Sequence, residues 1–206
     1  MDELRQVVRG NRAERAIADL SRAVTLLARG DHQAAASEAA KAKEAAPRSA
    51  AVREVLGLAL YRGERFREAQ AELQAYRRMS GRQDQNHLIA DCHRALGSPE
   101  KSVPLVEEEL RSPVPEEARA EAAIVGASAL ADMGRYPEAL TLLRRFSRKS
   151  DLGRTWDLRV WYVTGDVLDR AGRPEEAAAE FRKVVRHDAG AFDAAERLAQ
   201  LSGSAS

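Results

Sequence analysis

Residues 161–188 read WYVTGDVLDRAGRPEEAAAEFRKVVRHD, and the spacing of their apolar and small side chains decides the fold. Trp161 and Gly165 are four residues apart, which places them on one face of a helix. After a Gly-Arg-Pro break, Ala177 and Phe181 repeat that spacing on a second helix. A glycine opposite an alanine lets two helices approach closely, although glycine costs about 1 kcal/mol of helix propensity relative to alanine. The stretch therefore predicts a closely packed helix pair.

Breaks of the same kind recur along the chain, each between two helical stretches. They lie at 28–36, 61–69, 95–103, 132–140 and 170–178. The residues aligned after them are Ala35, Ala69, Val103, Ala139 and Ala177. The first two intervals are 34 residues, and the later two are 36 and 38. A period of this length is typical of stacked helical repeats, whereas a helical bundle without repeats does not explain five aligned breaks.

The period and the breaks resemble the tetratricopeptide repeat, with its pattern W-x2-L-G-x2-Y, then A-x3-F, then P. The fifth repeat matches with Trp161, Thr164, Gly165, Leu168, Ala177 and Phe181. The second matches with Arg53, Leu56, Gly57, Leu60, Ala69 and Leu73, and the fourth with Ala123, Gly126, Ala127, Leu130, Ala139 and Leu143. The third repeat is degenerate. The resemblance implies an all-α fold, a right-handed α-solenoid of about five helix-turn-helix repeats with a C-terminal capping helix.

The repeat register predicts the domain organisation. The expected parts are a cap or helix extension at 1–15, a repeat domain at 16–191, a capping helix at 192–202 and a disordered tail at 203–206. The repeats are expected at 16–49, 50–83, 84–117, 120–153 and 158–191. The capping helix should turn Phe192, Ala195, Leu198 and Leu201 inward.

Proline and glycine mark the expected helix ends. Pro137 and Pro174 should lie in the first turns of their helices, where a missing N–H is tolerated. Glycines should end the preceding helices, where a left-handed residue is often required. These glycines are Gly63, Gly97, Gly134 and Gly172.

Composition excludes several classes of protein. Lys+Arg 33 against Asp+Glu 32 gives no global attraction to nucleic acid or to an anionic membrane. No stretch approaches the roughly 20 apolar residues of a membrane span, and the charged N-terminus lacks the apolar run of a signal peptide. Cys92 is the single cysteine, which rules out an intrachain disulfide and favours a reducing compartment. We expect a cytoplasmic protein.

Catalytic and metal-binding patterns are not evident. His87, Cys92 and His93 are one thiol and two imidazoles on a single helix, which is not the ligand set or spacing of a zinc site. No motif places a base and an orienting acid around Cys92, and the glycines form no phosphate-binding fingerprint. The sequence predicts no catalytic, cofactor or metal residue and a protein that is not an enzyme.

The stretch 144–159 carries an alternative function. It contains six basic residues and only two acidic ones, Asp151 and Asp157, and Trp156 lies among them. Basic residues interleaved with an aromatic are one footprint of nucleic-acid binding. An ordinary solvated linker, with its tryptophan packed on the neighbouring repeat, is the other reading.

A partner-binding surface follows from the resemblance, because repeats of this kind bind through the concave surface lined by each first helix. The expected groove residues are Leu20, Val24, Glu54, Leu58, Tyr61, Leu88, Cys92, Tyr162 and Asp166. None is a lysine or an asparagine, so the subclass that grips acidic chaperone tails is excluded. We expect a non-enzymatic scaffold or adaptor that binds a peptide or helix of a partner protein there.

The apolar stripe around Leu20 and Val24 predicts that something covers the first repeat. Three coverings are possible: residues 1–12 folded back, a second copy in a homodimer through the N-terminal repeats, or an amphipathic helix of a partner.

The stretches 56–81, 88–97 and 159–198 also resemble a family of cytoplasmic tetratricopeptide-repeat proteins from high-GC Gram-positive bacteria (actinobacteria). That resemblance implies a bacterial source and no particular activity.

Overall fold

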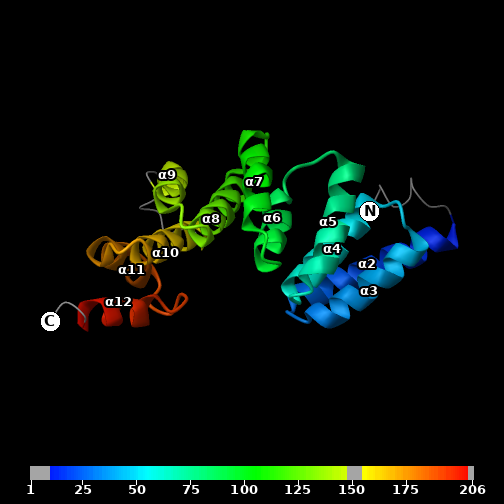
Figure 1. Cartoon of the computed structure of the whole chain (residues 1–206). Coiled ribbons are helices and arrows are strands. Elements are labelled where there is room, and N and C mark those ends of the chain that lie inside the picture. The colour runs from blue at the N-terminus through cyan, green and yellow to red at the C-terminus, as the bar shows by residue number, and fades with distance from the viewer. Residues whose placement is uncertain (1–9, 148–154, 204–206) are drawn as a thin grey trace. The chain divides into compact units, whose positions relative to one another are not determined.

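The computed structural model describes residues 10–147 and 155–203, and the chain divides into two compact units, Met1–Ser98 and Pro99–Ser206. Every regular element among the described residues is a helix (Figure 1). Each unit has its own buried core. The all-α class that the resemblance implies is confirmed.

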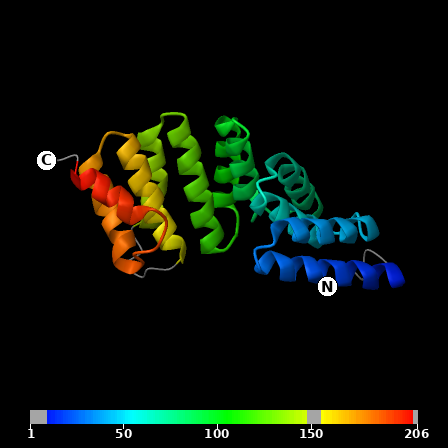
Figure 2. The ribbon, with the colours of Figure 1, turned by 90° about the horizontal axis from the view of Figure 1, so that it is seen from below.

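The first unit holds helices that pack in chain order. They are α2 (Asn11–Ala28), α3 (His32–Ala45), α4 (Ala50–Arg62), α5 (Phe66–Ser80) and α6 (Asn86–Ala95). Each of these helices contacts the next one, and Figure 2 shows α2 and α3 lying side by side. Small side chains make the close contact between neighbouring helices possible. The fully buried alanines include Ala16, Ala23, Ala35, Ala39 and Ala42.

The second unit has the same arrangement with larger core residues. Its elements are a 3-10 turn η1 (Pro99–Lys101), α7 (Ser102–Arg111), α8 (Glu116–Asp132), α9 (Tyr136–Ser147), α10 (Thr155–Arg170), α11 (Pro174–His187) and α12 (Ala194–Gly203). Trp161, Phe181 and Leu143 are among its largest buried side chains. α12 packs on α11 at the C-terminal end of this stack.

Glycine sets the contact between paired helices, but the residue nearest to Gly165 is Phe181 and not the expected Ala177. A Cβ placed on Gly165 would lie 2.9 Å from Cε1 of Phe181, closer than real Cβ contacts occur. Gly57 is equally close to its partner helix, because a Cβ there would lie 2.7 Å from Cγ of Leu73. The spacing of Gly165 and Phe181 is therefore explained by direct contact between the first and second helix of a repeat.

The helix ends follow the predicted pattern with one exception. Gly97, Gly134 and Gly172 have positive φ angles of 76°, 74° and 71° and end their helices in the left-handed conformation. Gly63 does not, since its φ is −87°, and Glu64 takes the left-handed conformation instead with φ 58°. Glu64, the second residue after the end of α4, therefore occupies the place that Gly134 has after α8, and the prediction for Gly63 is wrong.

The prolines and polar caps agree with local rules for helix starts. Pro174 begins α11, and Pro137 is the second residue of α9. Asp31 caps α3, because its side chain accepts a hydrogen bond from the backbone N–H of Ala34 at 3.1 Å.

The third repeat departs from the predicted register by one residue. Ser102 is fully buried at the small site of α7, whereas Val103 is half-buried. The 3-10 turn η1 directly precedes α7, and α7 then begins at Ser102, which turns that residue into the core.

The C-terminal end also differs in detail from the prediction. α12 begins at Ala194, which is buried, while Phe192 lies before the helix and Ala195 is exposed. Leu198 and Leu201 do pack against the core of the second unit. Residues 1–9, 148–154 and 204–206, which include most of the predicted N-terminal cap, part of the basic stretch and most of the tail, lie outside the described residues.

Candidate interaction faces

In the first unit, the predicted groove residues come from α2, α4 and α6, but they differ in accessibility. Leu20 is buried and packs with Val52 in the core, and Cys92 is buried with no exposed surface. Val24 is the most open of the set, with 49% of its surface exposed. Because Leu20 and Cys92 are covered by their own unit, they are core residues in this structure and do not offer surface to a ligand.

The remaining predicted residues of the first unit are half-buried on α4 and α6. They are Glu54, Leu58, Tyr61 and Leu88. They combine two apolar side chains with a carboxylate and a phenol, so this face can take both apolar and hydrogen-bonding groups. The structure brings Tyr61 and the neighbourhood of Cys92 together, because Tyr61 packs against the core cluster that contains Cys92.

A hydrogen-bonded chain links α4 to α6. The hydroxyl of Tyr61 donates to Oδ2 of Asp91 at 2.6 Å, and Nε of Arg94 donates to Oδ1 of the same carboxylate at 2.8 Å. The Tyr61 ring also meets Phe66 edge-on, with ring centres 5.9 Å apart. Tyr61 is therefore held in one orientation from two sides.

Glu54 occupies a partly dry position on the same face. Its Oε1 accepts a hydrogen bond from Nε2 of Gln85 at 2.9 Å. Burial raises the pKa of Glu54 above its ordinary value, because a carboxylate loses solvation when it leaves water.

Cys92 has the environment of a structural residue. Burial raises the pKa of its thiol to about 12, with a smaller contribution from Asp91. The thiolate is the nucleophilic form of cysteine, so a thiol with this pKa is unreactive at neutral pH. Among the described residues, no group of three or more His, Cys, Asp or Glu side chains is arranged to hold a metal ion.

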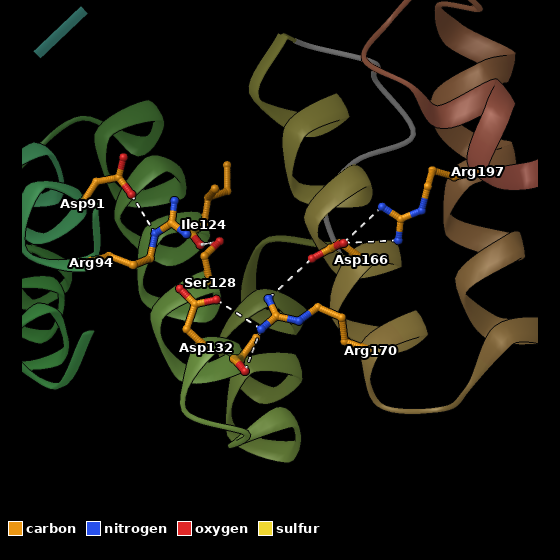
Figure 3. A network of polar contacts seen from close by, with 9 residues as sticks. Asp91, Arg94, Ile124, Ser128, Asp132, Asp166, Arg170 and Arg197 are labelled. Carbon is orange, nitrogen blue, oxygen red and sulfur yellow. Dashed lines mark hydrogen bonds and ion pairs between the residues drawn. The ribbon is translucent and has the colours of Figure 1, made fainter. Parts of the chain in front are cut away.

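In the second unit, Asp166 lies at the centre of a charged network across three helices (Figure 3). Its Oδ1 accepts hydrogen bonds from both terminal nitrogens of Arg197 on α12 at 3.2 Å, and its Oδ2 lies 3.8 Å from Nη1 of Arg170. Arg170 in turn donates to the carbonyl of Ala131 at 3.0 Å and to Oδ1 of Asp132 at 3.1 Å on α8. The first helices of consecutive repeats are thus joined by ion pairs on one face.

Arg197 also donates to Oδ2 of Asp169 at 2.9 Å, so one guanidinium joins the carboxylates of Asp166 and Asp169 to α12. The two carboxylates lie on α10, where a cationic group of a ligand could also reach them.

Tyr162 stands one turn before Asp166 and joins α10 to the loop before α12. Its hydroxyl donates to Oδ1 of Asp193 at 2.6 Å, and burial together with this hydrogen bond raises the pKa of Tyr162 to about 12. Its ring lies 4.8 Å from that of Phe192, which is 54% exposed and has a left-handed φ of 56°. An exposed aromatic in a strained backbone conformation is typical of a binding surface.

The predicted residues Tyr162 and Asp166 lie on this surface, and the sequence analysis did not single out Arg170, Arg197 or Phe192 beside them. The partners of Asp166 are 4 and 31 residues away, and the second spacing is close to one repeat, which is the signal that could have identified Arg197. Phe192 was expected to face inward because it was assigned to the capping helix. The hydrogen-bonded turn at Asp188 and Gly190 ends before it, and Phe192 is left outside α12.

The basic stretch does not present its tryptophan on the surface. Trp156 is only 8% exposed and belongs to the core of the second unit, so its ring is not free to stack on a base. Asp157, beside it, is fully buried. Residues 148–154 of this stretch lie outside the described residues. No helix in the described part of the chain is long and apolar enough to cross a membrane.

Known structures resemble this chain over most of its length. The TPR protein YrrB, described as having an unusual peptide-binding site, matches with a TM-score of 0.60 and 19% identity over 88% of this chain and 90% of its own. TTC0263, a thermophilic TPR protein from Thermus thermophilus, matches with a TM-score of 0.72 and 16% identity over 91% of this chain and 98% of its own. PilW, a type IV pilus biogenesis factor, matches with a TM-score of 0.75 and 14% identity over 92% of this chain and 87% of its own. The sequence has no match among curated proteins.

At the level of sequence, a family model described as a tetratricopeptide repeat matches residues 124–195, which run from the middle of α8 to the start of α12. The helix pairs, the glycine contacts and the solved structures agree with it. The predicted solenoid class is confirmed. Residues 124–195 are a tetratricopeptide-repeat segment, and the chain as a whole has the fold of the tetratricopeptide-repeat proteins.

Proposed function

We propose that this chain is a non-enzymatic scaffold whose first-helix faces bind a peptide or helix of a partner protein. Tetratricopeptide-repeat proteins are in general protein-interaction scaffolds, and YrrB is described as a TPR protein with a peptide-binding site. The observation that carries the proposal is the face of α10 and the adjoining α12 end in the second unit. There, the exposed ring of Phe192 lies on Tyr162 one turn from the network of Asp166, Arg170 and Arg197.

The chemistry of that face suits a peptide with an apolar or aromatic side chain next to a basic one. The side chain would pack on Phe192 and Tyr162, and the cation would meet the carboxylates of Asp166 and Asp169. Most contacts of this network join different helices of the same unit, so the face is rigid before a ligand arrives. A preorganised surface loses less conformational entropy on binding.

The first unit offers a second, more apolar face around Leu58, Tyr61 and Leu88. Its exposed Val24 on α2 is a candidate contact for a partner helix or for a second copy of the chain. We place the protein in the cytoplasm, on the argument of its single buried cysteine.

The test is affinity capture from the source organism with three forms of the full-length chain. The wild type should retain a specific protein. A variant with Phe192→Ser and Asp166→Lys should lose it, because both the apolar and the acidic contact are removed. A control with Glu175→Lys, on the exposed start of α11, should retain it. Equal retention by all three forms would contradict the proposal for this face.

A further inference from the structure

A groove on the opposite side of the repeats, between α7 and α9 of the second unit, belongs to neither face described above. It has a volume of about 510 Å³, and its floor is formed by α8. Its apolar lining consists of Val103, Val106, Leu110, Leu130 and Leu142, with Gly126 between them. This outer groove is thus lined by the second helices of two consecutive repeats.

Gly126 draws the two walls of the outer groove together. A Cβ on Gly126 would lie 2.7 Å from Cγ1 of Val106 on α7 and 2.9 Å from Cδ2 of Leu142 on α9. Both side chains therefore rest directly on the backbone of α8. The repeat pattern has leucine at this position in the second repeat, Leu56, so the glycine is specific to the second unit's groove.

The first unit contains an equivalent outer groove, of about 490 Å³, between α3 and α5 over Leu56 and Leu60 of α4. There, an ion pair crosses from one wall to the other: Nζ of Lys43 on α3 lies 2.5 Å from Oε1 of Glu72 on α5. Arg53 adds a second cation at 2.6 Å from Oε2 of Glu72. The walls of the first unit's groove are tied together by charges.

The second unit replaces this entire ion-pair cluster by apolar groups. Counted from the buried small residue of each helix, Lys43 corresponds to Leu110 and Glu72 corresponds to Leu142. Arg53 corresponds to Ala123, by the same repeat pattern. Where an ion pair joins the two walls of the first unit's groove, the second unit's groove has two half-buried leucines, Leu110 and Leu142.

The charges at the edge of the second groove favour an anionic ligand. Glu138 is engaged by Arg135, whose Nε and Nη2 donate to its two carboxylate oxygens at 2.7 and 2.6 Å. Arg111 on α7 is largely exposed, and its Nη1 makes a long contact of 3.7 Å with Oε2 of Glu107. Arg145 on α9 is also exposed. Both arginines lie at the C-terminal ends of their helices, beside Leu110 and Leu142. Cations therefore flank the apolar floor at that end.

We propose that this outer groove docks a segment of a partner protein in which an acidic side chain adjoins apolar ones. The apolar side chains would cover Leu110 and Leu142, and the carboxylate would pair with Arg111 and Arg145. Burial of apolar surface supplies affinity, and the charged edge selects the acidic sequence and its direction in the groove. This site is separate from the face around Asp166, whose proposed ligand is cationic, so one chain would hold two segments of opposite charge.

The test begins with a random library of 12-residue displayed peptides selected on the full-length wild-type chain, and the enriched peptides are then synthesised for fluorescence anisotropy. The selection should enrich a class with aspartate or glutamate next to leucine, isoleucine or phenylalanine. A double variant with Leu110→Lys and Leu142→Glu rebuilds the ion pair of the first unit in the second groove. It should fold and reduce the affinity of this class at least tenfold.

Matched single variants test the charged edge. Arg145→Glu should weaken the acidic peptides at least tenfold, and Arg144→Glu should leave their affinity unchanged, because Arg144 is an exposed neighbour that does not line the groove. If the Leu110→Lys, Leu142→Glu variant does not fold, the Arg145 and Arg144 pair decides the question alone.

The results that would overturn the proposal are distinct from failure of the first-helix faces. Acidic peptides that bind Arg145→Glu at full strength, or that lose affinity with Asp166→Lys instead, would show that the outer groove is not their site. Enrichment of no acidic, apolar class would exclude the proposed ligand.

Discussion

Trp161 and Phe181 illustrate how single residues carry the stability of a repeat. Trp161 is 2% exposed, and its indole lies 5.1 Å from the ring of His187 at the end of α11. Phe181 is fully buried over Gly165. Each side chain fills the space between a first and a second helix, so its removal leaves a cavity that the neighbouring helices cannot close without moving.

Replacing Trp161 with alanine should therefore lower the free energy of unfolding by about 3–5 kcal/mol. Urea denaturation followed by circular dichroism measures the difference. Phe192→Ala, at an exposed aromatic of the same unit, is the control and should cost only about 0.5–1.5 kcal/mol, the contribution of its ring contact with Tyr162. Equal unfolding midpoints for wild type and Trp161→Ala would mean that the register of the fifth repeat is wrong.

Glu64 is the residue that departs from the glycine rule. It adopts φ 58° in the turn where the equivalent residues of the fourth and fifth repeats are Gly134 and Gly172. A side chain in the left-handed region costs about 1–2 kcal/mol of conformational strain. Glycine avoids this strain, but it loses more conformational entropy on folding, so only part of the strain energy is gained.

The substitution Glu64→Gly should therefore stabilise the protein by about 0.5–1 kcal/mol. The reverse change at the matched site, Gly134→Ala, should destabilise it, although space is open around Gly134. Thermal melts of the two variants give the signs. Stabilisation by both substitutions would show that backbone conformation is not what selects these residues.

At the scale of elements, the fixed quantity is the distance between helices. Small residues at Ala35, Ala69, Ala139 and Ala177 are fully buried, each on the second helix of its pair. In two pairs the first helix supplies a glycine that receives a large side chain of the second helix, since Leu73 packs on Gly57 and Phe181 packs on Gly165. This contact repeats along the chain, and the grooves on the outer side form where two second helices are separated by a first helix.

Ala69→Leu should destabilise the protein by about 1–3 kcal/mol, because the larger side chain has no space between α4 and α5. Ala71→Leu is the control on the same helix, since Ala71 lies at the exposed edge of the outer groove. Chemical denaturation of the two variants compares them. The prediction fails if Ala71→Leu proves to be the more damaging change.

At the scale of the whole molecule, stability is distributed over two units with separate cores. In a solenoid each repeat contacts its neighbours only, so a local defect weakens with distance along the chain. The core of the first unit is built mostly from alanine and that of the second from larger side chains.

Hydrogen exchange should therefore show a local response to Trp161→Ala. Amide protection should fall in α10 and α11 and stay unchanged in α2 and α3. Mass spectrometry of peptic fragments resolves the helices. Loss of protection throughout the chain at the same rate would indicate a single cooperative unit in place of a repeat array.

Partner binding is also a property of the whole chain. Leu58→Arg together with Leu88→Glu should abolish capture of a partner that uses the first unit, while helicity and the melting temperature stay nearly unchanged, because both side chains are half-buried. Capture at full strength by this double variant would assign the partner to another surface. Unfolding of the variant would show that the two leucines are core residues.

The sequence by itself determined the class of fold, the order of the helices and the close glycine contacts. These depend on local spacing. Pairs such as Gly165 and Phe181, or Ala69 and Leu73, have counterparts in other repeats because each helix pair packs in the same way. Local patterns also placed Tyr162 and Asp166 on one side of a helix, because they are four residues apart.

Tertiary structure alone decided which polar and apolar side chains meet. Asp166 gains Arg197 from 31 residues away, Leu20 and Cys92 enter the core, and Trp156 is buried within the basic stretch. The replacement of Lys43 and Glu72 by Leu110 and Leu142 acquires a meaning only when α7 and α9 lie over one helix. Periodicity fixes the face on which a residue lies, whereas burial and ion pairing depend on what the neighbouring helices bring to that face.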